Sequence, residues 1–306
     1  MTTTQFDPLG TAIALLSADV PGVITETPED WPRWEVVLPH ALAAIEQWEK
    51  QAWTPDRVTA EHCAYLMDRA GAYLEVQGQL TEARDLMERG LILTERTVDP
   101  GHPAIPARLH NLSRSVNLTG FPEKAQPLAE RALALAEEAH GCNSSEVAFN
   151  LINLANILGE QGNFDEARRL LERALAIGES ELGLSHPSVA ILLNNLGLIL
   201  EATGQFDEAQ EHLERAVALS RENLGEDNPG LAVSMINLGN LLRVTGRLEE
   251  AHDLSRRATD VLERAYGPDH PELANSLVSL AEILEDLGRA DDAAPLRERA
   301  ARIRRQ

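Results

Sequence analysis

The sequence is poor in cysteine, in aromatic residues and in lysine. Of its 306 residues only Cys63 and Cys142 are cysteines, and aromatic residues make up 4%. Two thiols cannot build a disulfide framework or a site of four metal-binding thiolates. We therefore expect both cysteines to be small, buried apolar residues. Only Lys50 and Lys124 are lysines, a usage that carries no functional signal.

Basic residues are too few to balance the acidic ones. The chain has 49 acidic and 27 basic residues, for a formal net charge of -22. Such a chain repels phosphate backbones and anionic lipid surfaces at long range, so we expect neither nucleic acid nor a membrane as partner. The apolar stretch 12–20 is too short to span a bilayer, and no lysine or arginine precedes it as in a secretory signal. We expect a soluble, cytoplasmic protein.

Signatures of catalysis are missing as well. The sequence has no phosphate-binding loop G-x-x-x-x-G-K-[ST], and none of the motifs H-E-x-x-H, G-x-G-x-x-G, G-x-S-x-G and C-x-x-C. We expect no enzyme activity and no cofactor. The alternative, an enzyme built on helical repeats, would need a polar constellation, and its candidates are scattered along the chain: Arg69, His110, Arg114, Glu160 and Asp286.

What the chain does have is a period of 42 residues. Six glycines and six alanines recur at this step, and an asparagine-leucine pair recurs in four successive copies. So many coincident registers exclude chance, and such a period indicates a repeat architecture. The two series are Gly78, Gly120, Gly162, Gly204, Gly246 and Gly288, and Ala83, Ala125, Ala167, Ala209, Ala251 and Ala293.

Each copy is predicted to contain two amphipathic helices. Residues 187–203 carry apolar side chains at helical spacing, begin with Pro187 after a capping-type Ser-His pair, and stop at Gly204. A second apolar stripe runs from Phe206 to Gly225, a C-terminal stop. Two such helices cannot cover their own apolar faces, so each pair must stack on the next and build an all-α solenoid.

Small residues and histidines recur in the same frame. Gly197 and Ala209 leave room for a neighbouring helix to approach within about 8–10 Å. The histidines before three of the prolines, His102, His186 and His270, are too far apart in a stack to share one metal ion. We expect them to cap helices, and we expect no metal site.

The repeated phrase resembles the tetratricopeptide repeat. The residues that match its pattern are Leu196, Gly197, Leu200, Gly204, Ala209, Leu213 and Ala216. The 42-residue length, with Leu182-Gly183 and His186-Pro187, is similar to the kinesin light chain subtype. The resemblance covers roughly residues 60–306 and implies a right-handed α-solenoid of six helix pairs with a concave, peptide-binding groove. The first and last copies depart from the pattern at Arg69, Ser279 and Pro295, as terminal copies facing water do.

The first 58 residues differ from the rest because they hold all four tryptophans, Trp31, Trp34, Trp48 and Trp53. We expect prolines to break this segment, leaving one amphipathic helix from about Pro39 to Gln51. The predicted division is a helical cap at 1–58 and six repeats with a C-terminal capping helix at 59–306. The residues 31–40 also resemble the junction that leads into sensor arms of bacterial STAND-type signalling ATPases.

Asparagine recurs at one mid-helix register in four copies: Asn111, Asn153, Asn195 and Asn237. Asparagine there is disfavoured relative to alanine by roughly 0.7 kcal/mol, so the ladder needs a reason. The resemblance implies that this register faces the concave groove, and Asn156 and Asn240 share that face. An amide both donates and accepts hydrogen bonds, which suits the backbone of an extended peptide. The alternative is that each asparagine bonds a neighbouring repeat and fixes the stacking.

The residues four positions before each ladder asparagine favour contact with a ligand. They are Ala107, Phe149, Ile191 and Val233, which make the same face partly apolar. We predict that the amides hold the main chain of a bound segment and that Phe149, Ile191 and Val233 take its apolar side chains.

Arginines offer a second set of candidates. Arg69 and Arg114 join the ladder near its first-repeat end, where guanidinium groups could capture a carboxylate. This resembles, without matching, the carboxylate clamp of chaperone-binding tetratricopeptide domains, which depends on lysines absent here. The alternative is that these arginines neutralise the chain's own acidic excess. We expect the arginine that recurs in Glu-Arg pairs, as in Glu214-Arg215, to meet a carboxylate on its own or a neighbouring helix.

Together these features predict a non-catalytic module that binds a peptide or protein segment in its groove. One alternative is a sensor component of a STAND-type signalling system. Self-association is another open use, through the Trp-rich end or the arginine-rich tail Arg297–Arg305.

Overall fold

The structure is a computed structural model that describes residues 7–21, 30–51 and 57–305. These residues form fourteen α-helices and no strand. The chain divides into two compact units, residues 1–139 and 140–306. The helices of the first unit are α1 (Pro8–Asp19), α2 (Trp31–Lys50), α3 (Arg57–Val76), α4 (Leu80–Thr97), α5 (Ala104–Leu118) and α6 (Pro122–His140), which ends at the boundary.

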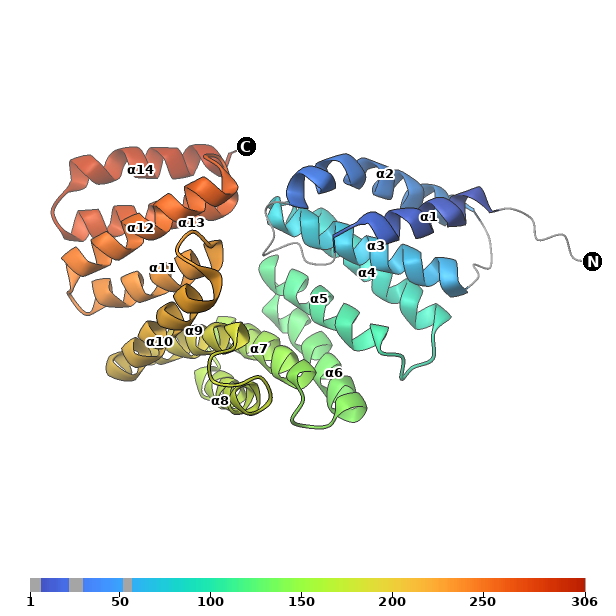
Figure 1. Ribbon diagram of the computed structural model, residues 1–306, viewed down its shortest axis with the longest axis horizontal. Helices are drawn as coiled ribbons and strands as arrows, with labels where there is room; N and C mark the ends of the chain where they lie inside the picture. The colour runs from blue at the N-terminus through green and yellow to red at the C-terminus, as the bar shows by residue number, and fades with distance from the viewer. Residues whose placement is uncertain (1–6, 22–29, 52–56, 306) are drawn as a thin grey trace, which may run out of the picture. The chain divides into compact units, whose positions relative to one another are not determined.

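The second unit contains four successive helix pairs (Figure 1). The two helices of each pair pack against each other, and the second helix also packs against the first helix of the next pair where one follows, as α10 does with α9 and α11. The first helices of successive pairs also touch one another. The helices are α7 (Ser145–Glu160), α8 (Phe164–Glu181), α9 (Pro187–Ala202), α10 (Phe206–Leu224), α11 (Pro229–Val244), α12 (Leu248–Tyr266), α13 (Pro271–Asp286) and α14 (Ala290–Ile303).

The helix ends follow the sequence signals closely. His186 Nδ1 accepts a hydrogen bond from the backbone N–H of Ser188, so this histidine caps α9. His102 and His270 accept equivalent bonds, which confirms the predicted capping role. Gly204 ends α9 with φ +77°, in the left-handed region that other residues rarely adopt. The expected bounds of both helices in this pair are confirmed to within one residue.

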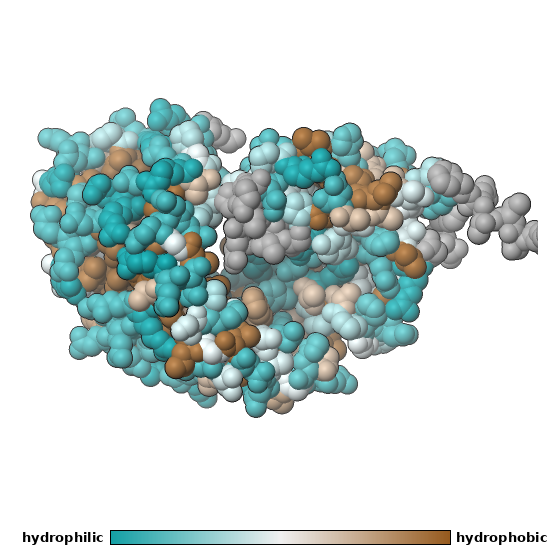
Figure 2. Space-filling view, in the orientation of Figure 1, coloured by the Kyte–Doolittle hydropathy of each residue, from teal (hydrophilic) through white to brown (hydrophobic). Residues whose placement is uncertain are grey.

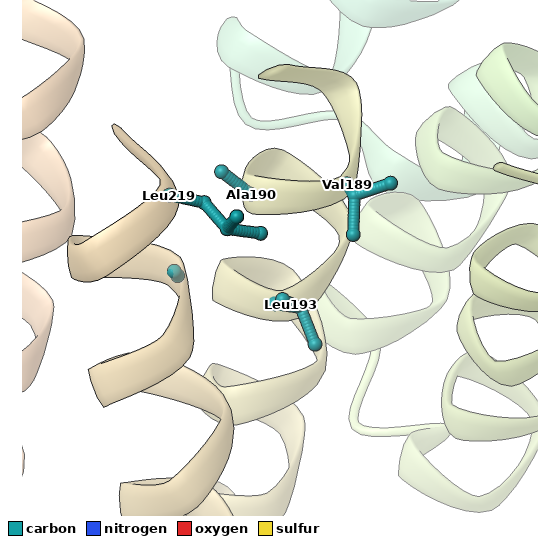
Figure 3. Packing of buried hydrophobic residues seen from close by; sticks show 5 residues of the cluster. Val189, Ala190, Leu193 and Leu219 are labelled. Atoms are coloured by element: carbon teal, nitrogen blue, oxygen red, sulfur yellow. The ribbon is translucent and has the colours of Figure 1, made fainter. Parts of the chain in front are cut away.

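The core consists of aliphatic side chains shared by neighbouring helices. Figure 3 shows one such cluster, in which Val189, Ala190 and Leu193 of α9 pack with Leu219 of α10. All four side chains are buried. Each fully buried valine or leucine side chain contributes about 1.5–3 kcal/mol, so apolar burial between helices stabilises the stack.

Small residues let the two helices of a pair approach closely. A Cβ added to Gly197 in α9 would lie 2.6 Å from Leu213 Cγ of α10. The equivalent Gly239 in α11 faces Ser255 of α12 in the same way. These glycines therefore serve the packing that the sequence predicted for them.

The amino-terminal helices differ from the prediction. The amphipathic helix expected from Pro39 begins at Trp31, so Pro39 lies inside α2. Proline in a helix interior costs about 3 kcal/mol, because it removes one hydrogen bond and crowds the carbonyl four residues earlier. Here that carbonyl belongs to Glu35, and both residues are exposed, so water can satisfy it. Burial of Trp34 and Val37 on the opposite side offsets the cost.

Trp34 packs α2 against its neighbour α3. Trp34 is fully buried and its ring stacks on Tyr73 of α3, with ring centroids 5.4 Å apart. Helix α1 packs on both α2 and α3. The predicted sensor-arm junction lies within α2, whereas Trp53 lies outside the described residues. The division at residue 58 and the kinship with sensor arms both stay predictions.

The cysteine prediction is half correct. Cys63 is buried in α3 as expected. Cys142 is exposed, which corrects the expectation that both are core residues. The reason is its place in the loop before α7, where the backbone runs over the surface.

Candidate functional site

Large apolar side chains are exposed along the first helices of the pairs in the second unit. Phe149 of α7, Ile191 of α9 and Val233 of α11 occupy the same register and are 52%, 44% and 44% exposed. Two turns further on, that face carries Asn156, Leu198 and Asn240. We call this surface the A-helix face and define it as Phe149 and Asn156 of α7, Ile191, Asn195 and Leu198 of α9, and Val233, Asn240 and Val244 of α11.

Two of the ladder asparagines bond to the preceding repeat. Asn237 Nδ2 donates to Asn194 Oδ1 over 3.0 Å, from α11 to α9. In the first unit, Asn111 Nδ2 donates to Asp68 Oδ2 over 2.9 Å, from α5 to α3. In both cases the acceptor lies 43 residues earlier. These bonds support the stacking alternative at these two positions.

The remaining ladder asparagines divide into a buried one and an open one. Asn153 is 6% exposed, so its amide lies within the stack. Asn195 is half-buried, and its side-chain amide makes no hydrogen bond with any other described residue. The same is true, within the described part of the chain, of the exposed Asn156 and the half-buried Asn240. The second unit therefore presents a row of apolar side chains next to open amides, meaning side-chain amides that make no hydrogen bond with any other described residue.

The two candidate arginines lie in the first unit and already contact carboxylates of the chain. Arg69 Nη2 lies 2.9 Å from Asp68 Oδ2, and its guanidinium also lies over the ring of Tyr65. Arg114 forms an ion pair with Glu75, which is buried. Burial raises the pKa of Glu75, and the nearby Arg114 opposes that rise. These pairs support the alternative that the arginines neutralise the chain's own acidic groups.

A buried polar cluster connects α3, α4 and α5, and the sequence did not reveal it. Arg108 Nε donates to Thr94 Oγ1 over 2.6 Å, and its Nη1 donates to the carbonyl of Ala64 over 2.9 Å. The same Nη1 lies 3.9 Å from Asp68 Oδ2. Burial lowers the pKa of the Arg108 guanidinium. The signal available in the sequence was the charge of Arg108. One repeat later, the same register holds the uncharged Asn150.

The Glu-Arg pairs have the structural role that was predicted for them. Arg215 of α10 forms an ion pair with Glu179 of α8, and Arg299 of α14 contacts both carboxylate oxygens of Glu263 in α12. In each case the arginine reaches the carboxylate 36 residues earlier, on the second helix of the preceding pair. These contacts are half-exposed, so each stabilises the stack by about 1 kcal/mol or less.

Part of the arginine-rich tail is also engaged within the chain. Arg297 contacts both carboxylate oxygens of Glu285 at 2.6 Å, and Arg304 donates to Asn275 Oδ1 over 3.0 Å. Arg302 and Arg305 are exposed. The self-association alternative through this tail stays a prediction.

The described residues also bear on metals, membranes and catalysis. No three histidine, cysteine or acidic side chains among them lie together as metal ligands would. No described helix is long and apolar enough to cross a bilayer. Of the enzyme candidates, Asp286 is paired with Arg243. Arg69 lies in α3, His110 and Arg114 lie in α5, and Glu160 lies in α7.

Comparison with known families agrees with this architecture. A family model of the tetratricopeptide repeat matches residues 61–138, 107–180, 188–264 and 245–306, and a second one matches residues 152–223. The chain belongs to the tetratricopeptide repeat family. No curated protein matches the sequence of this tetratricopeptide repeat protein.

Solved structures share its fold. BtubC (BKLC) from P. vanneervenii is 22% identical with a TM-score of 0.56, over 75% of this chain and 90% of that one. A kinesin light chain-type protein from Podosopora anserina with nearly identical TPR-like repeats is 26% identical with a TM-score of 0.51, over 65% and 94%. A Rap protein complexed with Competence and Sporulation Factor is 17% identical with a TM-score of 0.67, over 90% and 71%.

Proposed function

We propose that this tetratricopeptide repeat protein is a non-catalytic module that binds an extended segment of a protein partner on its A-helix face. The observation that carries the proposal is the row of exposed Phe149, Ile191 and Val233 next to the open amides of Asn156, Asn195 and Asn240. Apolar side chains gathered on one surface mark an interaction site, because water disfavours their exposure.

The chemistry of this face suits an extended peptide. Each amide offers two donors and an acceptor, which match the carbonyl and N–H groups of a main chain. The apolar residues recur once per repeat and can take apolar side chains spaced along the segment. A Rap protein with the same fold is complexed with Competence and Sporulation Factor, which supports a bound factor as a use of this fold.

A protein segment also fits the charge of the chain better than nucleic acid does. The net charge of -22 repels polyphosphates. Figure 2 shows a surface that is mostly hydrophilic, with apolar residues in small groups.

The test is a selection of random dodecapeptides displayed on phage against the 306-residue chain. Synthetic copies of the selected peptides are then measured by fluorescence polarisation against the variant Phe149→Ser/Ile191→Ser. Loss of two apolar contacts should weaken binding by at least about tenfold, since each is worth roughly 1 kcal/mol or more.

The matched control is Leu184→Ser/Leu224→Ser, which removes two exposed apolar side chains of the second unit away from this face. It should bind as the unaltered protein does. Equal weakening in both variants, or no effect in either, would contradict the proposal.

A further inference from the structure

The A-helix face is bordered by charged residues at the ends of its helices. Glu160 lies at the end of α7, Glu201 near the end of α9 and Arg243 near the end of α11. Glu282 and Asp286 follow on α13. The border of this face therefore contains four carboxylates and one guanidinium.

The Arg243 guanidinium forms ion pairs with two carboxylates of α13. Its Nη2 lies 3.1 Å from a carboxylate oxygen of Glu282, and its Nη1 lies 3.0 Å from one of Asp286. The terminal nitrogens of this guanidinium thus already bind two carboxylates. Arg243 donates no hydrogen bond to Glu201, and its charge opposes the rise in the pKa of that carboxyl.

Glu201 holds in α9 the register that Arg243 holds in α11, 42 residues later. Arg243 of α11 contacts Glu282 and Asp286 of α13, which is the first helix of the next pair. The same register therefore points Glu201 of α9 toward α11, near Asn240 and Val244 of the A-helix face. The Glu201 carboxylate is half-buried and accepts no hydrogen bond from any other residue of the described ranges. Burial raises its pKa, which means that water solvates the charge less well than at the surface.

A half-buried carboxylate without a hydrogen-bond donor is best stabilised by a cation that brings its own donors. The chain itself supplies donors of this kind elsewhere, as Arg299 does for Glu263. At Glu201 no described residue supplies such a donor, so a cationic side chain of a bound partner can do so. The apolar row beside it, with Ile191 and Leu198 on the same helix, requires that the same partner also carries apolar side chains.

We infer that the segment bound on the A-helix face is basic and amphiphilic. Its apolar side chains pack on Phe149, Ile191 and Val233, and an arginine or lysine pairs with Glu201. This inference rests on the proposed function and adds the chemistry of the partner.

The experiment continues the random dodecapeptide selection against the 306-residue chain. Selected peptides should be enriched in arginine or lysine at one position relative to their apolar residues. Replacing that residue by glutamine should weaken binding about tenfold, because a charge-assisted hydrogen bond is lost. Glu201→Gln should weaken binding of the basic peptide by the same factor and leave the glutamine peptide unaffected.

The matched control is Glu222→Gln, which removes an exposed carboxylate of α10 away from the face. It should leave both affinities unchanged. Neutral or acidic selected peptides, or unchanged binding by Glu201→Gln, would overturn the basic partner. The proposed function would stand in that case if Phe149→Ser/Ile191→Ser still weakened binding. Loss of any effect from that apolar variant would overturn the proposed function itself. A chain that dimerises in sedimentation and releases its dimer on Phe149→Ser/Ile191→Ser would overturn the inference in favour of a second copy.

Discussion

Asn237 and Asn195 occupy the same register of the repeat but have different neighbours. The residue 43 positions before Asn237 is Asn194, whose carbonyl oxygen accepts its hydrogen bond. The residue 43 positions before Asn195 is Ile152, which has no polar side-chain atom. The amide of Asn237 therefore bonds the preceding repeat, whereas the amide at the same register one repeat earlier, Asn195, makes no hydrogen bond with any described residue.

This difference predicts opposite effects of two alanine substitutions. Asn237→Ala should lower the free energy of unfolding by about 1 kcal/mol, because the buried Asn194 loses its donor. Asn195→Ala should leave it unchanged or raise it by up to roughly 0.7 kcal/mol, because alanine favours helix. Urea titrations followed by circular dichroism measure both. Equal destabilisation would show that Asn195 also fixes the stacking.

The two cysteines are predicted to differ in reactivity. Burial raises the pKa of the Cys63 thiol to about 12, so almost none of it is the reactive thiolate at pH 8. Cys142 is exposed. Iodoacetamide at pH 8 should therefore add one group per native chain and two per chain in urea, as mass spectrometry can count. Native Cys142→Ser should add none, and modification of that variant at the rate of a free thiol would contradict the burial of Cys63.

Within a helix pair, glycine is required where the two helices are closest. Gly197→Ala should lower the free energy of unfolding by about 1 kcal/mol, since overpacking costs about 1–3 kcal/mol and the gain in helix propensity is at most about 1 kcal/mol. At Gly159 an added Cβ would meet only the tip of Ile199, at 3.1 Å. Gly159→Ala should therefore leave stability unchanged or raise it.

Thermal unfolding of the two glycine variants, followed by circular dichroism, tests this prediction. A Gly197→Ala protein as stable as Gly159→Ala would mean that Leu213 can move away from the added methyl group without loss of stability. Helix propensity would then be the only effect of either substitution.

The sequence predicted the elements of the repeats well because their ends depend on local chemistry. His186, Pro187 and Gly204 set the bounds of α9 through capping, a fixed φ and a positive φ. The same local reasoning failed at Pro39, because the helix there continues when tertiary burial outweighs the proline penalty. Local signals therefore suffice in the repeats and fall short before them.

The candidate site was predictable in part. The exposed row Phe149, Ile191 and Val233 follows from helical periodicity, which places all three on one face. The partners of Asn237 and Arg108 depend on the register between helices of different repeats, which a single helix pattern does not contain. The open state of Glu201 depends on the same register and was missed.

Over the whole chain, the acidic excess should oppose folding at low salt. The formal charge of -22 repels itself, and the screening length falls from about 30 Å at 0.01 M to about 10 Å at 0.1 M salt. We expect the melting temperature to rise between 10 mM and 200 mM NaCl, as calorimetry can measure. A fall would mean that ion pairs such as Arg299–Glu263 contribute more than the net repulsion removes.

The partner segment is proposed to lie on α7, α9 and α11 of the second unit. The most direct measurement is photo-crosslinking of a selected dodecapeptide that carries a benzophenone side chain, with the crosslinked residues mapped by mass spectrometry. We predict crosslinks to these three helices close to Phe149, Ile191 and Val233. Crosslinks confined to α8, α10 and α12, or to the first unit, would contradict it.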